Sequence, residues 1–225
     1  MYQQSTEVIT STSNDSLIER VLRGVGIAFL LTMLGMVASY FVFGQNIQLA
    51  NQFGMIAGFI GLGLLLFTYF IRKSSAISYK FVWTFAVIEG FAIYPLIFIY
   101  TQVLGGAIVT ACFGLASAIF IGLSIYAWKS KRDFTFMGSM LMVTLIVLII
   151  AGIANIFLSL SALGTIIAAV SLIVFSGFIL YDVSILKQTG FTEAMIPALI
   201  LSMYLNFINI FLDLLRLAWA LFADE

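Results

Sequence analysis

The side chains in this chain that could do chemistry lie inside apolar segments. Asp182 ends one apolar run, and Asn206, Asn209 and Asp213 follow at spacings of three and four residues in the next run. A carboxylate at the end of a bilayer-spanning helix is costly, so it needs a partner or a function. Oxygen-bearing side chains of this kind suit a proton or a cation. Asp182, Asn206 and Asn209 are therefore candidates for an ion or proton site.

Glu89 is a further acid in the middle of an apolar segment. It lies ten residues after Tyr79, which is about 15 Å along a helix axis. Asn206 lies at a similar depth in its own segment, so the two side chains could meet. Gly90 would admit a close neighbouring helix. Two interpretations stay open for Glu89: a neutral, hydrogen-bonded acid, or part of an ion or proton site.

Seven of the ten acidic residues lie in tails or loops, where water solvates them. Asp213 and Arg216 are three residues apart near the end of the last apolar segment. This spacing brings two side chains together on a helix surface. We therefore expect an ion pair between them at the membrane interface, with a structural role.

The composition indicates a membrane protein. Hydrophobic residues make up 63% of the chain and charged residues 9%, whereas soluble domains are about 45–50% apolar and about 25% charged. A net charge of zero argues against nucleic-acid binding. The chain has no histidine, the usual metal ligand and general base. Its single cysteine, Cys112, excludes an intrachain disulfide and is expected to be a packing residue.

Seven segments are long and apolar enough to span a bilayer, which requires about 20 residues each. They cover approximately 24–43, 53–71, 81–100, 104–128, 135–158, 162–182 and 196–218. The loops are short and no internal repeat is visible, which argues against an inverted-repeat transporter. The sequence thus predicts an all-α, polytopic protein with a polar N-terminal tail, 1–19, and a single seven-helix domain, 20–225. Glycines such as the Gly54-x-x-x-Gly58 pair are expected to pack helices within that domain.

The basic residues predict the topology. Nine of the ten fall before the first span or after spans two, four and six: Arg20, Arg23, Arg72, Lys73, Lys80, Lys129, Lys131, Arg132 and Lys187. Basic loops remain in the cytoplasm. We therefore expect a cell (inner) membrane protein with its N-terminus in the cytoplasm and its C-terminus outside. This topology places Arg72 and Asp182 at the same depth, where they could form an ion pair that is either a structural clasp or a gate.

Four segments resemble the Bax inhibitor-1 family, also called the transmembrane Bax inhibitor motif family, and in particular its bacterial members of the YetJ type. The first two are 70–79, with Arg72, and 81–90, with Glu89 and followed by Pro95. The other two are 180–187, with the pair Tyr181-Asp182, and 201–216. The resemblance covers about residues 70 to 218.

The resemblance implies a seven-helix fold whose last helix is enclosed by the others, and a calcium leak that responds to pH. It also implies a cytoplasmic-side latch, in which two aspartates share a proton and pair with an arginine. Arg72 and Asp182 match two of these residues, whereas Asn206 stands where the second aspartate is expected. Because asparagine cannot ionise, one of two coupled titrations is missing. We hypothesise that the latch keeps an altered pH response, or that Glu89 supplies the missing acid.

The sequence therefore predicts a pH-sensitive calcium leak channel gated by a latch of Arg72, Asp182 and Asn206. The alternative is a non-conducting regulator that binds another membrane protein, since some bacterial relatives resemble modulators of membrane proteases. An enzyme is not expected, because the chain has no histidine, no Gly-x-Ser-x-Gly sequence and no second aspartate opposite Asp182. We expect no cofactor, calcium as the permeant ion with Asp182 as a transient ligand, the bilayer as surroundings, and no nucleic-acid partner. The sequence does not indicate an oligomeric state.

Overall fold

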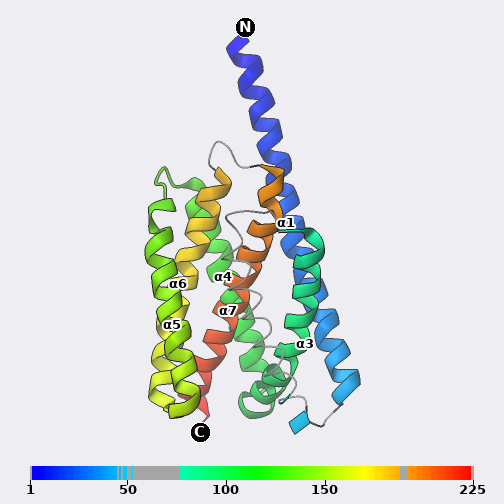
Figure 1. Ribbon diagram of the computed structural model, residues 1–225, viewed down its shortest axis with the longest axis vertical. Helices are drawn as coiled ribbons and strands as arrows, with labels where there is room; N and C mark the ends of the chain where they lie inside the picture. Colours follow the sequence, from blue (N-terminus) through cyan, green and yellow to red (C-terminus); the bar gives the residue numbers. More distant parts are fainter. Residues whose placement is uncertain are drawn as a thin grey trace. The chain divides into compact units, whose positions relative to one another are not determined.

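The regular structure is helical. The computed structural model describes residues 2–44, 46, 48–49, 52, 77–187 and 192–223, with side chains from residue 16 onward, and this part contains no strand. The long helices are α1 (Tyr2–Phe43), α3 (Tyr79–Leu104), α4 (Gly106–Lys129), α5 (Gly138–Leu158), α6 (Ser161–Lys187) and α7 (Ile196–Phe222) (Figure 1). Two short 3-10 turns, η1 (Thr135–Met137) and η2 (Glu193–Met195), precede α5 and α7.

Six helices in the described part are long and apolar enough to cross a membrane. They coincide with the predicted first, third, fourth, fifth, sixth and seventh spans. The predicted second span, 53–71, lies outside the described residues, together with Gly54 and Gly58. The prediction of an all-α, multi-pass membrane protein is therefore confirmed, while the count of seven helices stays a prediction.

The chain divides into two compact units. One comprises Met1–Leu96 and Gly190–Tyr204, and the other comprises Ile97–Thr189 and Leu205–Glu225. Both boundaries fall inside helices, α3 and α7, and not in a linker. The division therefore does not test the predicted single domain, 20–225, or its polar tail, 1–19.

In the first unit, α1 and α3 lie side by side and run in the same direction. A Cβ atom added to Gly35 would lie 2.1 Å from the backbone oxygen of Val87, so the two backbones are in direct contact there. Further along both helices, the Tyr94 hydroxyl donates a hydrogen bond to the Gly44 carbonyl, at 3.1 Å. Contact of this closeness depends on the missing side chain of Gly35.

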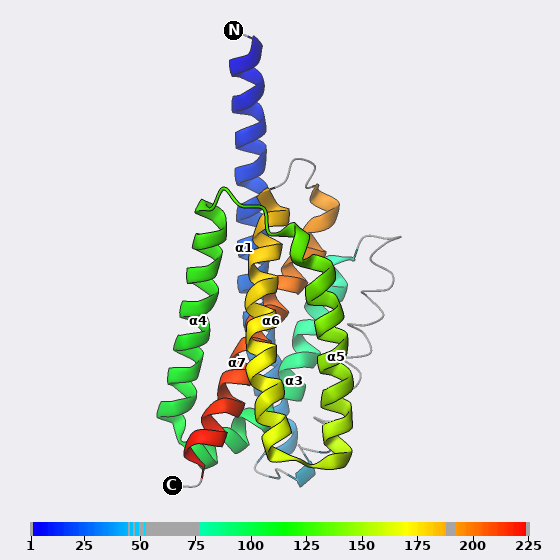
Figure 2. The same ribbon diagram turned by 90° about the vertical axis from the view of Figure 1, so that its left-hand side faces the viewer.

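In the second unit, α6 lies between α4 and α5 (Figure 2). It runs antiparallel to α5, because Gly138 faces Tyr181 near one end and Gly164 faces Asn155 near the other. Lys187 at the end of α6 reaches the end of α4, where its Nζ atom donates to the Ala127 carbonyl oxygen at 2.9 Å and to that of Ser130 at 2.7 Å. These bonds satisfy carbonyl groups that a helix end leaves without an intrahelical donor.

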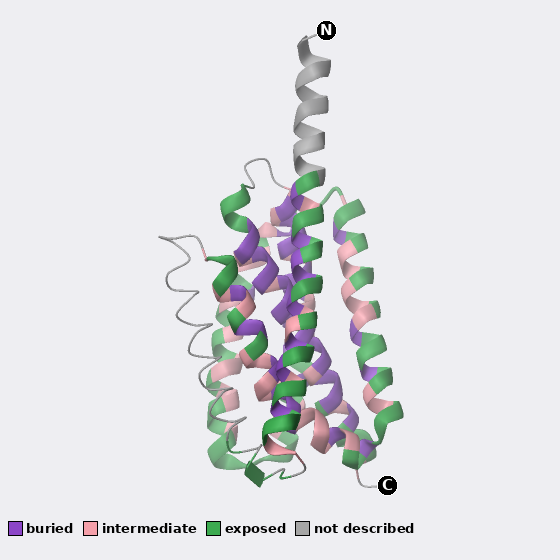
Figure 3. Cartoon of the chain, turned by 90° about the vertical axis from the view of Figure 1, so that its right-hand side faces the viewer, coloured by how far each residue is buried: buried purple, intermediate pink, exposed green. Residues whose placement is uncertain are grey.

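Helix α7 is the most buried of the six. Of the apolar 18-residue stretch of α7, 67% is buried. The corresponding share is at most 39% in any other described helix and 6% in α5. Exposed positions recur along the less buried helices (Figure 3), and many are large and apolar, as contact with lipid requires. In the second unit, α7 packs on α4 through the rings of Phe207 and Phe113, whose centroids are 5.5 Å apart. This burial agrees with the enclosed last helix that the resemblance implies.

Candidate functional site

Asp182 on α6 and Asn206 on α7 form a buried interhelical hydrogen bond. The Nδ2 atom of Asn206 donates to Oδ2 of Asp182 at 2.8 Å. Asp182 is 1% exposed and Asn206 is 3% exposed. A hydrogen bond to a carboxylate in an apolar interior is stronger than one in water. The pair therefore joins α6 to α7 at a point where neither residue is solvated.

The end of α6 that carries Asp182 is held on a second side. The Ser184 hydroxyl accepts a hydrogen bond from the backbone N–H of Phe134, at 3.2 Å, in the segment between α4 and η1. Lys187 binds the end of α4, as described above. These contacts hold the end of α6 in place. The backbone of Asp182 is therefore fixed where its carboxyl group contacts Asn206 on α7.

Arg72, the predicted third member of the latch, lies outside the described residues. The ion pair between Arg72 and Asp182 therefore stays a prediction. The structure brings Asp182 and Asn206 together, and that contact is the part of the predicted latch that can be described.

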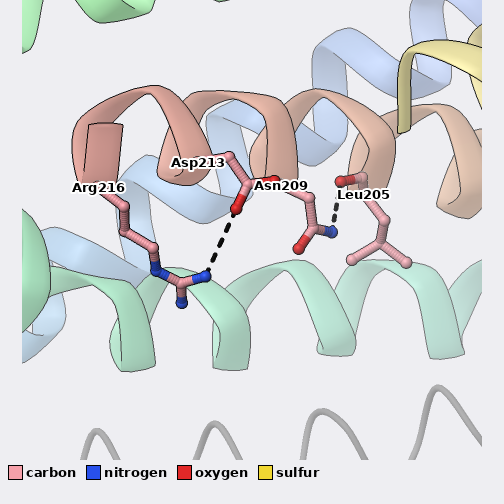
Figure 4. Close-up of polar contacts among 4 residues, drawn as sticks. All are labelled: Leu205, Asn209, Asp213 and Arg216. Carbon is pink, nitrogen blue, oxygen red and sulfur yellow. Dashed lines mark hydrogen bonds and ion pairs between the residues drawn. The ribbon is translucent and has the colours of Figure 1, made fainter. Parts of the chain in front are cut away.

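Asn209 makes a different contact from Asn206. Its Nδ2 atom donates to the carbonyl oxygen of Leu205, four residues earlier on the same helix, at 2.8 Å (Figure 4). This bond engages the backbone of α7 itself. It does not link Asn209 to Asp182, which accepts from Asn206, and the role of Asn209 in an ion site stays a prediction.

Asp213 forms the predicted ion pair, with Arg216 Nη1 at 3.4 Å from Asp213 Oδ1 (Figure 4). The acid is buried in the protein, at 2% exposure, a burial that the sequence did not predict. The signal that could have revealed this burial is its position on the stripe of Asn206 and Asn209, since a polar stripe turns away from lipid. The depth of the pair at the membrane interface stays a prediction.

Glu89 lies beside a buried pair of hydroxyl groups in the first unit. Thr32 Oγ1 and the Tyr204 hydroxyl are 2.7 Å apart, and Glu89 interacts electrostatically with Tyr204. Thr32 donates its one hydroxyl proton to the Ala28 carbonyl, at 2.9 Å. Tyr204 must therefore be the donor to Thr32. The sequence did not point to this pair, because neither hydroxyl group stands out by its type or spacing.

Gly90 has the neighbour that the sequence predicts. A Cβ atom added there would lie 2.0 Å from the backbone oxygen of Thr32. The close contact of α1 and α3 beside Glu89 therefore depends on this glycine. Whether Glu89 meets Asn206, or replaces the missing acid, stays a prediction.

The described residues contain no group of three His, Cys, Asp or Glu side chains that could hold a metal ion. A calcium ion bound at Asp182 would depend on amide and backbone oxygens for its other ligands. Such a site suits brief occupancy better than storage. Calcium binding at Asp182 stays a prediction.

Comparison with known proteins agrees with the sequence motifs and the fold. A family model described as "Inhibitor of apoptosis-promoting Bax1" matches residues 14–223. The chain belongs to the Bax inhibitor-1 family. The match begins well before residue 70, so the first span, which carries little recognisable sequence, is also part of the family pattern. Membership confirms the resemblance.

Individual relatives of this Bax inhibitor-1 protein are bacterial. An uncharacterized membrane protein of Vibrio cholerae is 38% identical over 162 residues, which cover 69% of this chain and 70% of the relative. Campylobacter jejuni has a relative that is 31% identical over 159 residues, covering 70% of this chain and 68% of the relative. A protein of Escherichia coli, named modulator of FtsH protease YccA, is 30% identical over 215 residues, covering 93% of this chain and 95% of the relative.

Proposed function

We propose that this chain is an inner-membrane protein that modulates a membrane-bound protease. The observation that carries the proposal is the similarity to YccA, which extends over 93% of this chain and 95% of that relative. A second YccA sequence of the same identity and coverage is named an inner membrane protein. Similarity of this extent is not confined to one pair of helices. It therefore favours the regulator, the alternative interpretation of the sequence, over the leak channel.

A non-enzymatic role suits the polar groups of the described helices. The buried acids Asp182 and Asp213 contact an amide and a guanidinium, respectively. Large apolar residues remain exposed on α4 and α5, and such faces can contact lipid or another membrane protein. The basic residues favour a cytoplasmic N-terminus for this regulator.

The test is degradation of a membrane substrate by an FtsH-type protease in proteoliposomes. We expect the chain, added in equimolar amount, to slow degradation several-fold and to co-purify with the protease from detergent extracts. The matched control is an unrelated polytopic protein of similar size at the same density. An unchanged rate without co-purification would exclude modulation of that protease.

A calcium leak is the second proposal, because of the hydrogen bond between Asp182 and Asn206. A buried carboxylate in a membrane helix marks an ion or proton site by default. Separation of α6 from α7 would break this bond and expose oxygen ligands to a passing cation. Protonation of Asp182 would weaken the bond by removing the charge on the acceptor. Arg72 completes the proposed gate on the cytoplasmic side.

Calcium flux into liposomes tests the leak. Wild type, Asp182→Asn and Asn206→Asp are compared across pH values of about 5 to 8, the range in which perturbed carboxyl groups titrate. We expect Asp182→Asn to lose most of the pH response and Asn206→Asp to make it steeper. A steep transition that survives in Asp182→Asn would exclude the gate. Unchanged flux in Glu89→Gln would exclude Glu89 as the substitute acid.

A further inference from the structure

Asp213 is a buried acid that neither proposed function uses. Asp213 is 2% exposed, and Arg216 Nη1 lies 3.4 Å from its Oδ1 atom. No hydrogen-bond donor among the described residues reaches its Oδ2 atom. The acid therefore has one long contact to a cation and one buried oxygen without a donor.

This environment is poor for an ionised carboxylate. Such a group accepts hydrogen bonds at about four positions on its two oxygens. A buried oxygen without a donor costs about 1–3 kcal/mol, and more when it carries charge. Charge-assisted bonds between nitrogen and a carboxylate are normally about 2.7–2.9 Å long. Arg216 is farther away, and its side chain is 49% exposed, so it solvates the carboxylate only weakly.

A protonated carboxyl group would fit the same surroundings. Its Oδ2 atom would then be a donor and would need only one acceptor. The buried hydroxyl group of Ser171, on α6, donates to the charged form of Asp213, while Oδ2 has no partner among the described residues. We propose that Asp213 is a proton-binding site, where Oδ2 takes up a proton and loss of that proton engages Arg216 and Ser171.

The groups that face Asp213 come from three helices. Arg216 lies on α7 itself, Tyr100 on α3 interacts electrostatically with both Arg216 and Asp213, and α6 contributes the uncharged Ser171. Helix α4 meets this part of α7 with Phe113, whose ring centroid is 5.7 Å from that of Phe211. Arg216 and Tyr100 are thus the charged and titratable neighbours of the site.

Proton binding at Asp213 has a structural consequence. The proton comes from water at the C-terminal end of α7, an O–H bond forms at Oδ2, and the negative charge of the carboxyl group disappears. Arg216 then loses its attraction to Asp213 and is free to extend toward the interface. Tyr100, which contacts Arg216, is packed edge-on against Trp219, with ring centroids 5.6 Å apart. Protonation of Asp213 therefore changes the environment of the Tyr100–Trp219 pair, which joins α3 to α7.

Trp219 provides a reporter of this change. In a protein with Trp83→Phe and Trp128→Phe, it is the remaining tryptophan. We expect its fluorescence in lipid nanodiscs to change in one step between about pH 4 and pH 9, where a buried carboxyl group titrates. Asp213→Asn should abolish the step and Asp182→Asn should retain it. A step that persists in folded Asp213→Asn would overturn the proposal.

Infrared difference spectroscopy tests the proton directly. Acidification should produce the carbonyl stretch of protonated Asp213, a band that is lost from the spectrum of Asp213→Asn and kept in that of Asp182→Asn. In Ser171→Ala, which removes a donor to the carboxylate, this band should appear at a higher pH. Loss of no band in Asp213→Asn, or an unchanged midpoint in Ser171→Ala, would overturn the assignment. Ser171→Ala keeps this test available if Asp213→Asn does not fold, and neither measurement depends on protease modulation or calcium flux.

Discussion

Two buried aspartates on neighbouring helices have different kinds of partner. Asp182 on α6 accepts a hydrogen bond from the amide of Asn206, which is itself buried on α7. Asp213 on α7 contacts a half-exposed cation on its own helix, Arg216, and the Ser171 hydroxyl of α6. The two acids are equally buried, but loss of Asp182 leaves a buried amide without its acceptor, whereas loss of Asp213 leaves Arg216 able to reach water. The difference in partner indicates a different role for each.

The largest expected effect is that of Asp182→Leu. It leaves the Asn206 amide buried without its acceptor, and we expect it to lower the free energy of unfolding by about 2–3 kcal/mol. Asp213→Leu is the matched variant, with an expected change within about 1 kcal/mol, because it removes a poorly solvated acid and leaves Arg216 able to reach water. Denaturation in mixed micelles followed by circular dichroism measures both. Equal losses would contradict the proposed difference between the two acids.

Asn206→Asp would make the Asp182 contact depend on pH. Two carboxyl groups at the observed contact distance of 2.8 Å cannot both ionise readily, so they would share one proton. Stability should be retained at low pH and fall by about 1–2 kcal/mol as the pH rises and the shared proton leaves. The same denaturation assay at several pH values measures this slope, with Asn209→Asp as control. A flat profile would show that the two side chains part when both are charged.

Much of the fold was predictable because the bilayer imposes simple rules on the sequence. Apolar segments of sufficient length and alternating basic loops located the six described spans. The contact between Asp182 and Asn206 was expected from the family resemblance alone. These features depend on composition and on position along the chain, which a sequence states directly.

The rotation of each helix about its axis was harder to predict. The burial of Asp213 was not expected, because a position near the end of a span does not say which side of α7 the side chain faces. The hydroxyl pair of Thr32 and Tyr204 also depends on which helices meet. Such pairings are set by small contact residues and neighbouring rings, and a single sequence does not specify them.

Lys187→Met tests how firmly the Asp182 end of α6 is anchored. The side chain donates two hydrogen bonds to carbonyl oxygens at the end of α4, but it is only half-buried, so we expect a loss of about 1 kcal/mol. Hydrogen exchange of amides 127–134 should accelerate, and Lys129→Met, at an exposed position, should leave it unchanged. If both variants behave alike, the anchoring of α6 comes from apolar packing and not from Lys187.

The smallest expected effect is that of Asn209→Ala. Its amide donates to the Leu205 carbonyl on the same helix, and alanine favours the helix enough to offset that loss, so the change should stay below about 0.5 kcal/mol. Asn206→Ala is the comparison, with an expected loss of about 1–2 kcal/mol because Asp182 loses a donor. Similar losses in the two variants would mean that Asn209 shares the site of Asp182. Unequal losses would separate the polar stripe of α7 into one residue that joins helices and one that binds its own backbone.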